Sequence, residues 1–311
     1  MRVFLTGATG YIGTVLTKQL IEGGHQVLGL ARSEASAEQL EAMGAEVYRG
    51  DLDNLDSLAA GASAADAVIH TAMVIEDFND MDAAFARDEK AVEAMLAPLT
   101  GTGKPFVYAS GTGVLPDTGP EPADETLEAD FHGPVGRRAA LEQTILNAKD
   151  RDIRSVVIRP GIVYGNGGSG VWHMFAGLSM QAGAGRAIGD GTNVVSVVHV
   201  DDLADLFVRA LERGLAGTLF NAASEEKPTM LEIATAVGRA LNFTGPPSLW
   251  PVEEASAALG PFAEGMAANK RVSAARARDV LGWKPKAICV IDDLQSGSYP
   301  AAFAAAAASQ S

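Results

Sequence analysis

Short apolar runs alternate with amphipathic stretches through the first half of this 311-residue chain. The runs have the length of buried parallel strands, and the stretches between them have the period of helices. Alternation of this kind predicts an α/β fold in which helices cover both faces of a doubly wound parallel sheet. We expect strands at residues 3–5, 26–30, 46–48, 67–70, 106–109 and 155–159, and helices near 11–22, 34–43, 54–60, 79–98 and 135–149.

The pattern changes from about residue 160, where glycine-rich loops begin to separate shorter elements. We expect a large first unit at 1–160 and a smaller lobe at 161–300 that is interleaved with the last strands of the sheet. The alanine-rich end, 301–311, is expected to be frayed helix or disordered. Within the lobe we expect glycine-rich loops at 161–170 and 183–191, strands at 194–198 and 218–221, and helices at 201–213, 229–241 and 273–281.

Composition narrows the class of protein. A hydrophobic fraction of 47% with 20% charged residues is typical of a soluble globular protein with a large core. The net charge of −15 argues against nucleic acid as a partner. No apolar run reaches the roughly 18 residues of a membrane span, and the first residues already form a strand. The single cysteine, Cys289, excludes an internal disulfide and favours a reducing, cytoplasmic compartment. The five histidines lack ligand spacing, so we expect no metal.

Three glycines near the start of the chain carry the clearest chemistry. Gly7, Gly10 and Gly13 lie between the first expected strand and the first expected helix. Gly7 permits a tight turn, Gly10 lets the backbone approach phosphates, and Gly13 lets the helix pack close to the strand. The helix N-terminus then presents free N–H groups to an anion. This pattern predicts that 1–160 form a Rossmann-type dinucleotide-binding unit and that the lobe at 161–300 binds the substrate.

The end of the second strand indicates which dinucleotide is bound. Sites that prefer NAD usually carry an acidic residue here to bind the ribose hydroxyls. This chain has Arg32 and Ser33 instead, a guanidinium and a hydroxyl that suit a phosphate. We therefore expect NADP(H), with NAD(H) as the less favoured cofactor.

The ends of the third and fourth strands supply further candidates. Asp51 can accept a hydrogen bond from the adenine amino group while Leu52 packs on the ring, although Asp51 could equally cap the next helix. Thr71 and Ala72 are small and leave room for a ribose. His70, taken alone, is more typical of a half-buried histidine with its hydrogen bonds satisfied than of a catalytic one.

Six motifs together resemble those of the extended short-chain dehydrogenase/reductases, the NAD-dependent epimerase/dehydratase family. The resemblance covers nearly the whole chain in the same order, and it implies cofactor contacts from Thr9, Tyr11, Ile12 and Pro160. The motifs are TGATGYIG at 6–13, GDL at 50–52, HTA at 70–72, RPGIVYG at 159–165, VHVDD at 198–202 and LGWKP at 281–285.

The chain departs from this family at its catalytic pair. The resemblance implies a Tyr-x-x-x-Lys motif on the helix after the fifth strand, where the tyrosine passes a proton and the lysine holds the nicotinamide ribose. With Glu142 aligned to the family's glutamate, Arg138 takes the lysine position and Pro134 the tyrosine position. Arg138 can still bind ribose or phosphate, but its pKa above about 12 makes it a poor proton donor. The family's hydroxyl group is retained as Ser110 or Thr112, either of which could bind a substrate oxygen or merely cap a turn.

Two residues are candidates for the missing proton donor. His132 lies two residues before Pro134, and an unperturbed histidine pKa of about 6.5 suits proton transfer. Tyr164 lies after the sixth strand, in a motif that the family carries without using it in catalysis. His132 could equally be a surface histidine at a helix start, and water could supply the proton instead.

The lobe contains one further candidate for the substrate site. Trp172, Met174 and Phe175 follow the loop at 161–170, where they could wall a pocket for an apolar molecule or form the core of a helix. The nearby His199, Asp201 and Asp202 suggest no triad; we expect Asp201 to cap the following helix.

Taken together, the sequence predicts an NADP(H)-dependent oxidoreductase that reduces a carbonyl or similar group of a small, partly apolar organic molecule. The alternatives are a lyase, isomerase or epimerase on the same scaffold, or a non-catalytic NADP-binding sensor. A homodimer is compatible with the family resemblance.

Overall fold

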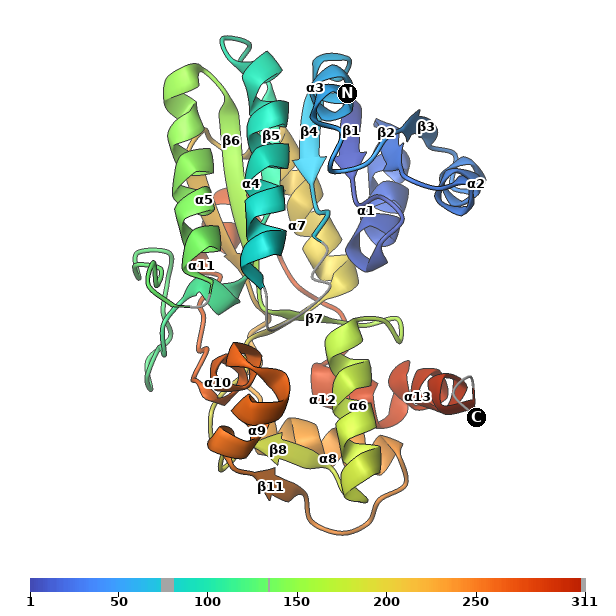
Figure 1. Cartoon of the computed structure of the whole chain (residues 1–311), viewed down its shortest axis with the longest axis vertical. Helices are drawn as coiled ribbons and strands as arrows, with labels where there is room; N and C mark the ends of the chain where they lie inside the picture. Colours follow the sequence, from blue (N-terminus) through green and yellow to red (C-terminus); the bar gives the residue numbers. More distant parts are fainter. Residues whose placement is uncertain (74–80, 134, 309–311) are drawn as a thin grey trace.

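A parallel sheet with flanking helices forms the upper part of the molecule as it is drawn in Figure 1. The computed structural model describes residues 1–73, 81–133 and 135–308. Within them, seven strands pair in the order β10-β6-β5-β4-β1-β2-β3. These are β1 (Arg2–Thr6), β2 (Gln26–Ala31), β3 (Glu46–Arg49), β4 (Ala67–His70), β5 (Pro105–Ala109), β6 (Arg154–Pro160) and β10 (Thr218–Ala222). All pairs are parallel, which confirms the predicted α/β fold. The chain runs outward from β1 to β3 and then returns to β4, so the strand order reverses beside β1 and opens a crevice at the carboxyl ends.

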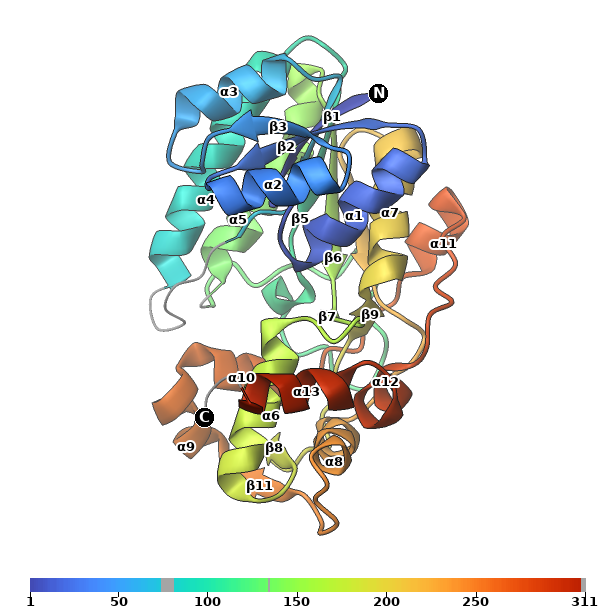
Figure 2. The same ribbon diagram turned by 90° about the vertical axis from the view of Figure 1, so that its right-hand side faces the viewer.

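Helices cover both faces of the sheet (Figure 2). One face buries an apolar cluster that includes Leu16, Leu40 and Phe207, and the other buries a cluster with Leu58 and Val92. The first face is covered by α1 (Tyr11–Glu22), α2 (Glu34–Ala42), α7 (Val200–Arg213) and α11 (Ala275–Leu281), and the second by α3 (Leu55–Ser63), α4 (Met81–Leu96) and α5 (Gly136–Asn147). The short 3-10 helices η1 (Ala97–Leu99), η2 (Thr112–Val114) and η3 (Ala148–Arg151) lie in the connections between these layers.

The smaller lobe lies beyond the carboxyl edge of the sheet and has its own apolar core (Figure 1). It contains α6 (Gly170–Ala182), α8 (Met230–Ala240), α9 (Val252–Leu259), α10 (Pro261–Ala267), α12 (Val290–Ser296) and α13 (Tyr299–Ala308). Strands β8 (Arg186–Ile188) and β11 (Ser248–Trp250) pair within the lobe, and β7 (Ile162–Tyr164) pairs with β9 (Val197–His199) beside the large sheet. None of the described helices is long and apolar enough to span a bilayer.

Two expectations about local structure were wrong. The strand expected at 194–198 covers only Val197–His199, because Val194 instead bridges Thr229. The next helix begins at Val200 and is capped by His199, whose Nδ1 accepts the backbone N–H of Asp201 at 3.1 Å. Asp201, the expected cap, is instead the second residue of this helix, and its carboxylate accepts a hydrogen bond from the Asn166 side chain.

The end of the chain is also more ordered than its composition suggests. Up to residue 308 it forms α13, with Tyr299 and Phe303 buried. The two aromatic rings stand four residues apart and therefore share one helix face. The Tyr299 hydroxyl donates to the Gly168 carbonyl at 2.9 Å, and the Phe303 ring packs edge-on against His173. An alanine-rich segment with two such anchors packs as a helix instead of fraying.

Candidate functional site

The glycine turn between β1 and α1 forms a concave surface. Gly7 has a positive φ of 71°, and a Cβ there would lie 2.8 Å from the Ala72 backbone nitrogen. A Cβ on Gly13 would run into the Gly7 carbonyl, so this glycine lets α1 pack onto the turn. A Cβ on Gly10 would meet only the Gly7 oxygen, at 3.2 Å. Gly10 is also the N-cap of α1 and provides no side-chain cap. The turn therefore leaves room and N–H donors for an anion.

A cavity of about 340 Å³ adjoins this turn at the carboxyl ends of β1 to β4, and we call it the glycine-turn cavity. Eleven of the predicted cofactor residues line it: Gly7, Thr9, Gly10, Tyr11, Ile12, Gly13, Arg32, Asp51, Leu52, Thr71 and Ala72. The structure adds Leu30, Ser36, Gly50, Met73 and Arg87. The predicted residues Ser33, Arg138 and Pro160 do not line it.

The end of β2 presents an exposed cation to the glycine-turn cavity. Arg32 makes no hydrogen bond or ion pair with the residues that the structure describes. Ser33 turns away and caps α2, accepting the Ser36 N–H at 3.2 Å, so Ser36 supplies the hydroxyl that faces the cavity. The neighbouring Glu34 is paired with Arg49 at 2.8 Å. The charge available at this end of the cavity is therefore that of Arg32.

Asp51, which follows β3, lines another part of the glycine-turn cavity. One carboxylate oxygen of Asp51 accepts the N–H groups of Asp53 and Asn54 at 2.9 and 3.0 Å. Asp51 thus orders the turn before α3, whose N-cap is Asn54, and also lines the cavity. Its contact with an adenine stays a prediction. Arg87 from α4 reaches the same part of the cavity and bonds Asp53, with its Nε 2.7 Å from the carboxylate. Sequence reasoning missed Arg87 because it lies in mid-helix and follows no strand.

Two unsatisfied polar atoms lie at the end of β5. Arg138 on α5 donates from Nη2 to the Ala109 carbonyl at 2.8 Å. Its Nε and the hydroxyl of Ser110 are both buried, and neither has a hydrogen-bond partner among the described residues. Buried donors without partners are costly, so these two atoms mark a place where a polar ligand group would be stabilised. Pro134, the residue at the family's tyrosine position, lies outside the described residues.

A row of buried, hydrogen-bonded side chains connects β1, β4 and β5 to α4 beside this region. The Thr6 hydroxyl lies 2.5 Å from His70 Nδ1, and His70 Nε2 lies 2.7 Å from the Asp88 carboxylate. The Tyr108 hydroxyl donates to the other Asp88 oxygen at 2.5 Å. Burial raises the pKa of Asp88, but the hydrogen bonds and charge of His70, with Tyr108 and Arg138, outweigh this and lower it overall. The hydrogen bonds of His70 are therefore satisfied, as expected, but the residue is fully and not half buried. Asp88 and Tyr108 are partners that the sequence did not reveal.

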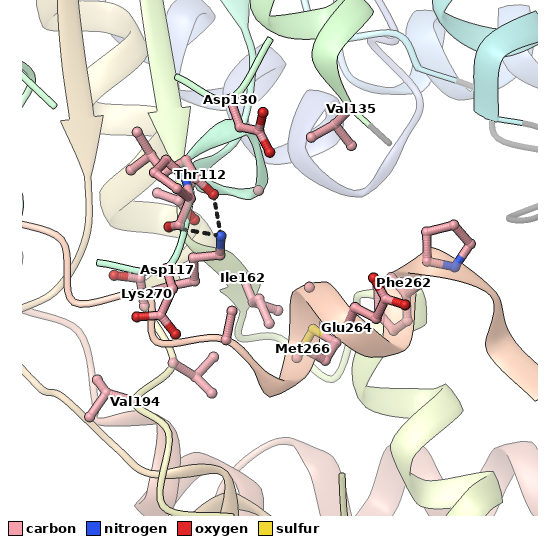
Figure 3. A pocket seen from close by; sticks show the side chains of 18 of the residues that line it. Thr112, Asp117, Asp130, Val135, Ile162, Val194, Phe262, Glu264, Met266 and Lys270 are labelled. Atoms are coloured by element: carbon pink, nitrogen blue, oxygen red, sulfur yellow. Dashed lines mark hydrogen bonds between the residues drawn. The ribbon is translucent and has the colours of Figure 1, made fainter. Parts of the chain in front are cut away.

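A second cavity, of about 350 Å³, lies between the sheet and the smaller lobe, and we call it the interlobe cavity (Figure 3). Thr112 lines it, whereas Ser110 does not. Its apolar lining comes mainly from Met81, Leu115, Pro116, Val135, Ile162, Val194, Val195, Pro261, Phe262, Met266 and Ala268. Its ionisable residues are Asp117, Asp130, Glu264 and Lys270. The cavity thus combines apolar walls with a few polar groups, as small-molecule sites do.

The other predicted catalytic residues, His132 and Tyr164, line neither cavity within the described structure. The side chain of His132 is exposed, and its backbone N–H donates to Asp130 at 2.9 Å. Tyr164 is buried in the lobe, where its hydroxyl donates to the Ile288 carbonyl at 2.8 Å and to Glu226 at 3.1 Å. Burial, followed by the charge of Glu226, raises the pKa of Tyr164. Neither residue is among the described residues that line the interlobe cavity.

The aromatic segment after the sixth strand belongs to the core. Trp172 and Phe175 are buried on α6, and the Trp172 Nε1 donates to the Val163 carbonyl at 2.8 Å. Neither lines the interlobe cavity, so the alternative of a helix core was correct and that of a pocket wall was wrong. Residues of η2 and α10 supply the wall instead.

A doubly wound parallel sheet, a glycine turn at its carboxyl edge and a lobe over that edge define a Rossmann-type protein of the short-chain dehydrogenase/reductase class. Residues 3–223 match the model of the NAD dependent epimerase/dehydratase family. An uncharacterized protein of Schizosaccharomyces pombe is 36% identical, covering 96% of this chain and 100% of that protein. The chain therefore belongs to the NAD-dependent epimerase/dehydratase family, as its motifs indicated.

Relatives within this family have different activities. A 2-alkyl-3-oxoalkanoate reductase of Stenotrophomonas maltophilia is 29% identical, covering 66% of this chain and 63% of the reductase. Among solved structures, a UDP-glucose-4-epimerase from Stenotrophomonas maltophila, crystallised with NAD and formylated UDP-arabinopyranose, has a TM-score of 0.78 at 21% identity over 99% of each chain. At that identity the likeness concerns the fold. Family membership therefore indicates an enzyme of the NAD(P)-dependent kind and leaves its reaction open.

Proposed function

We propose that this protein is an NADPH-dependent reductase acting on the carbonyl group of a small, neutral, partly apolar molecule. One observation carries the proposal: two cavities open at the same carboxyl edge of the sheet, one beside the glycine turn and Arg32, the other apolar and holding Thr112. Ala72, which follows β4, lines the first cavity, and Thr112, which follows the neighbouring strand β5, lines the second.

The residues of the glycine-turn cavity fit an NADP-type dinucleotide. Gly10 and the first N–H groups of α1 would hold the pyrophosphate, and Arg32 with Ser36 would hold the adenosine phosphate. Leu52 would pack on the adenine. The unsatisfied Arg138 Nε and Ser110 hydroxyl line neither cavity, so the nicotinamide ribose would have to extend past the glycine-turn cavity to the end of β5 to bind them. When bound, the reduced cofactor supplies a hydride.

The interlobe cavity favours a neutral substrate over a sugar nucleotide. Its volume of about 350 Å³ is at the lower end of the range for small-molecule sites. Three carboxylates, Asp117, Asp130 and Glu264, line it against one ammonium, which disfavours a pyrophosphate. Thr112 supplies a hydroxyl that can donate to a carbonyl oxygen, and the apolar walls suit a hydrocarbon substituent. This combination favours the reductase over epimerisation of a nucleotide sugar.

Fluorescence titrations of the purified protein with NADPH and with NADH test the cofactor assignment. Tight NADPH binding with much weaker NADH binding supports it, and NADPH oxidation should then follow with a panel of small aliphatic and aromatic aldehydes and ketones. Equal binding of both cofactors contradicts the role of Arg32. Failure to bind either one contradicts the reductase and favours a lyase or a partner-binding protein.

A further inference from the structure

Lys270 is the one ammonium among the described residues that line the interlobe cavity. It lies between α10 and α11 on a segment fixed on both sides. Its backbone N–H donates to the Val194 carbonyl at 2.9 Å, and the next residue, Arg271, donates to the Thr118 hydroxyl at 2.8 Å. The long side chain therefore extends from an anchored backbone into the cavity (Figure 3).

Two backbone carbonyls hold the ammonium group in place. Lys270 Nζ donates to the carbonyl of Leu115 and, at 3.2 Å, to that of Pro116 (Figure 3). An ammonium has three N–H donors, and the described residues provide no acceptor for the third. An oxygen atom of a ligand in the cavity could accept this third hydrogen bond.

The same two carbonyls connect Lys270 to Thr112. Leu115 and Pro116 follow directly on η2, which begins at Thr112. The bonds to Lys270 therefore also hold the loop that carries the threonine hydroxyl. Two donors, one cationic and one neutral, thus line one cavity from connected segments. Paired donors of this kind stabilise charge that develops on a reacting oxygen.

Burial makes the ammonium of Lys270 more acidic than that of an exposed lysine. Burial lowers the pKa of Lys270, although the charges of Asp117 and Asp130 oppose the shift. Neither carboxylate forms an ion pair with Lys270 within the described structure, because both are engaged elsewhere. Asp117 accepts the N–H groups of Gly119 and Asn269 at 2.7 and 3.0 Å, and Asp130 accepts those of His132 and Gly133. Glu264 of α10 is the third acidic group that faces the cavity.

Resting on the reductase function proposed above, we infer that Lys270 is a catalytic residue that donates a hydrogen bond, and then a proton, to the carbonyl oxygen of the substrate. As hydride from the reduced nicotinamide reaches the carbonyl carbon, the π-electron pair moves to oxygen. A Lys270 N–H bond breaks and an O–H bond forms, which leaves an alcohol and a neutral amine. A second proton, taken up from the solution, restores the ammonium. Lys270 thereby fills the role that the family's tyrosine would have.

The charge balance identifies the ligand as a neutral carbonyl and not a carboxylate. One ammonium faces three carboxylates in the cavity, so an anion would be repelled even though it could pair with Lys270. A neutral carbonyl oxygen accepts the free N–H without adding charge. An amide has the same acceptor and cannot be reduced under these conditions, so benzamide serves as a probe and benzoate as its anionic counterpart.

The experiment measures benzamide and benzoate binding to the NADPH-loaded protein by calorimetry. Lys270→Met removes the donor, and Lys270→Arg retains a cation that can still bond the two carbonyls. Lys227→Met is the matched control: Lys227 donates to the Ser224 carbonyl at 2.9 Å and its pKa is also lowered by burial, but it lies outside the cavity. NADPH titration and melting temperature show that each variant is folded.

Loss of one charge-assisted hydrogen bond should weaken benzamide binding about ten- to a hundredfold in Lys270→Met. Lys270→Arg and Lys227→Met should stay within a few-fold of the wild type. Wild-type rates of carbonyl reduction should fall as pH rises through the lysine pKa, and Lys270→Arg should lack this limb. Unchanged benzamide binding in Lys270→Met, no binding by the wild type, or tighter binding of benzoate each overturns the inference. Lys270-dependent benzamide binding without any NADPH oxidation instead overturns the reductase function and leaves the carbonyl site standing.

Discussion

The Tyr108 hydroxyl donates a 2.5 Å hydrogen bond to the Asp88 carboxylate, which joins β5 to α4 beneath the candidate site. The guanidinium of Arg138 lies 6.0 Å from the centre of the same tyrosine ring. Asp88 also forms a hydrogen bond with His70 Nε2, and the other ring nitrogen of His70 forms one with the Thr6 hydroxyl on β1. This chain of contacts ties the ends of β1, β4 and β5 to one buried charge. Asp88 therefore fixes the positions of strand ends that the proposed cofactor would touch.

Asp88→Asn should lower the free energy of unfolding by about 2 kcal/mol at pH 7, because it removes a buried charge from two hydrogen-bond donors. The native pKa of Asp88 lies below its ordinary value, so the wild type gains this stability above the unfolded pKa of about 3.9 and loses it as pH falls through the native value. The difference between wild type and variant should accordingly shrink below about pH 4. Urea unfolding at several pH values measures it.

Glu93→Gln is the control for this prediction. Glu93 lies on the same helix, where it pairs with Arg151 at 3.0 Å while more than half exposed. An exposed pair contributes little, so the control should change the free energy of unfolding by less than about 1 kcal/mol. Equal effects of both substitutions would mean that the Asp88 chain does not stabilise the sheet.

The two glycines of the turn should separate binding from stability. A Cβ at Gly10 would meet only the Gly7 carbonyl oxygen, at 3.2 Å, so Gly10→Ala should cost about 1 kcal/mol or less in unfolding free energy and yet weaken NADPH binding at least about tenfold. A Cβ at Gly13 meets the Gly7 carbonyl, so Gly13→Ala should lower stability by about 1–3 kcal/mol. Calorimetry and cofactor titration on both variants check this. Normal NADPH affinity in Gly10→Ala would show that the phosphates lie elsewhere.

Arg32→Ala should weaken NADPH binding about ten- to a hundredfold while changing NADH binding less than about threefold. The reason is that only NADPH carries the adenosine phosphate that this unpaired cation would bind. Arg49→Ala is a nearby control, since Arg49 is already paired with Glu34 and does not line the glycine-turn cavity. Fluorescence titration with both cofactors measures the ratio. A similar loss for NADH and NADPH in Arg32→Ala contradicts the assignment.

Periodicity and local motifs were sufficient to predict the sheet and the glycine-turn cavity. Strands β1, β2, β4, β5 and β6 are short buried runs that the sequence shows directly. The strand at 46–48 was expected to be buried as well, but β3 is the edge strand of the sheet and none of its residues is buried. Residues such as Gly7, Asp51 and Thr71 follow these strands. Parallel strands bring their carboxyl ends to one edge, so position after a strand is a good guide to a shared cavity. Arg87 and Asp88 escape this reasoning because they lie within α4, where only the packed helix decides which side chains face the sheet.

The interlobe cavity could not be predicted in the same way. Lys270 lies more than 150 positions after Leu115, and nothing local in the sequence brings them together. Trp172 and Phe175 were plausible pocket residues by composition, but helix α6 turns them into the core of the lobe. Which apolar residues wall a cavity and which fill a core depends on how the lobe docks on the sheet, a property of the whole fold.

Tyr164→Phe should separate a structural tyrosine from a catalytic one. The hydroxyl of Tyr164 bonds the Ile288 carbonyl and Glu226 inside the lobe, so its loss should lower the free energy of unfolding by about 1–3 kcal/mol. Because this hydroxyl lies outside the interlobe cavity, the rate of carbonyl reduction below the melting transition should stay within about twofold of the wild type. A tyrosine that donates the proton would instead lose about a hundredfold or more on removal. Steady-state rates with NADPH at saturating aldehyde distinguish a structural tyrosine from a catalytic one. Thr112→Val is measured beside it as the control, and this variant should slow reduction at least about tenfold without comparable loss of stability.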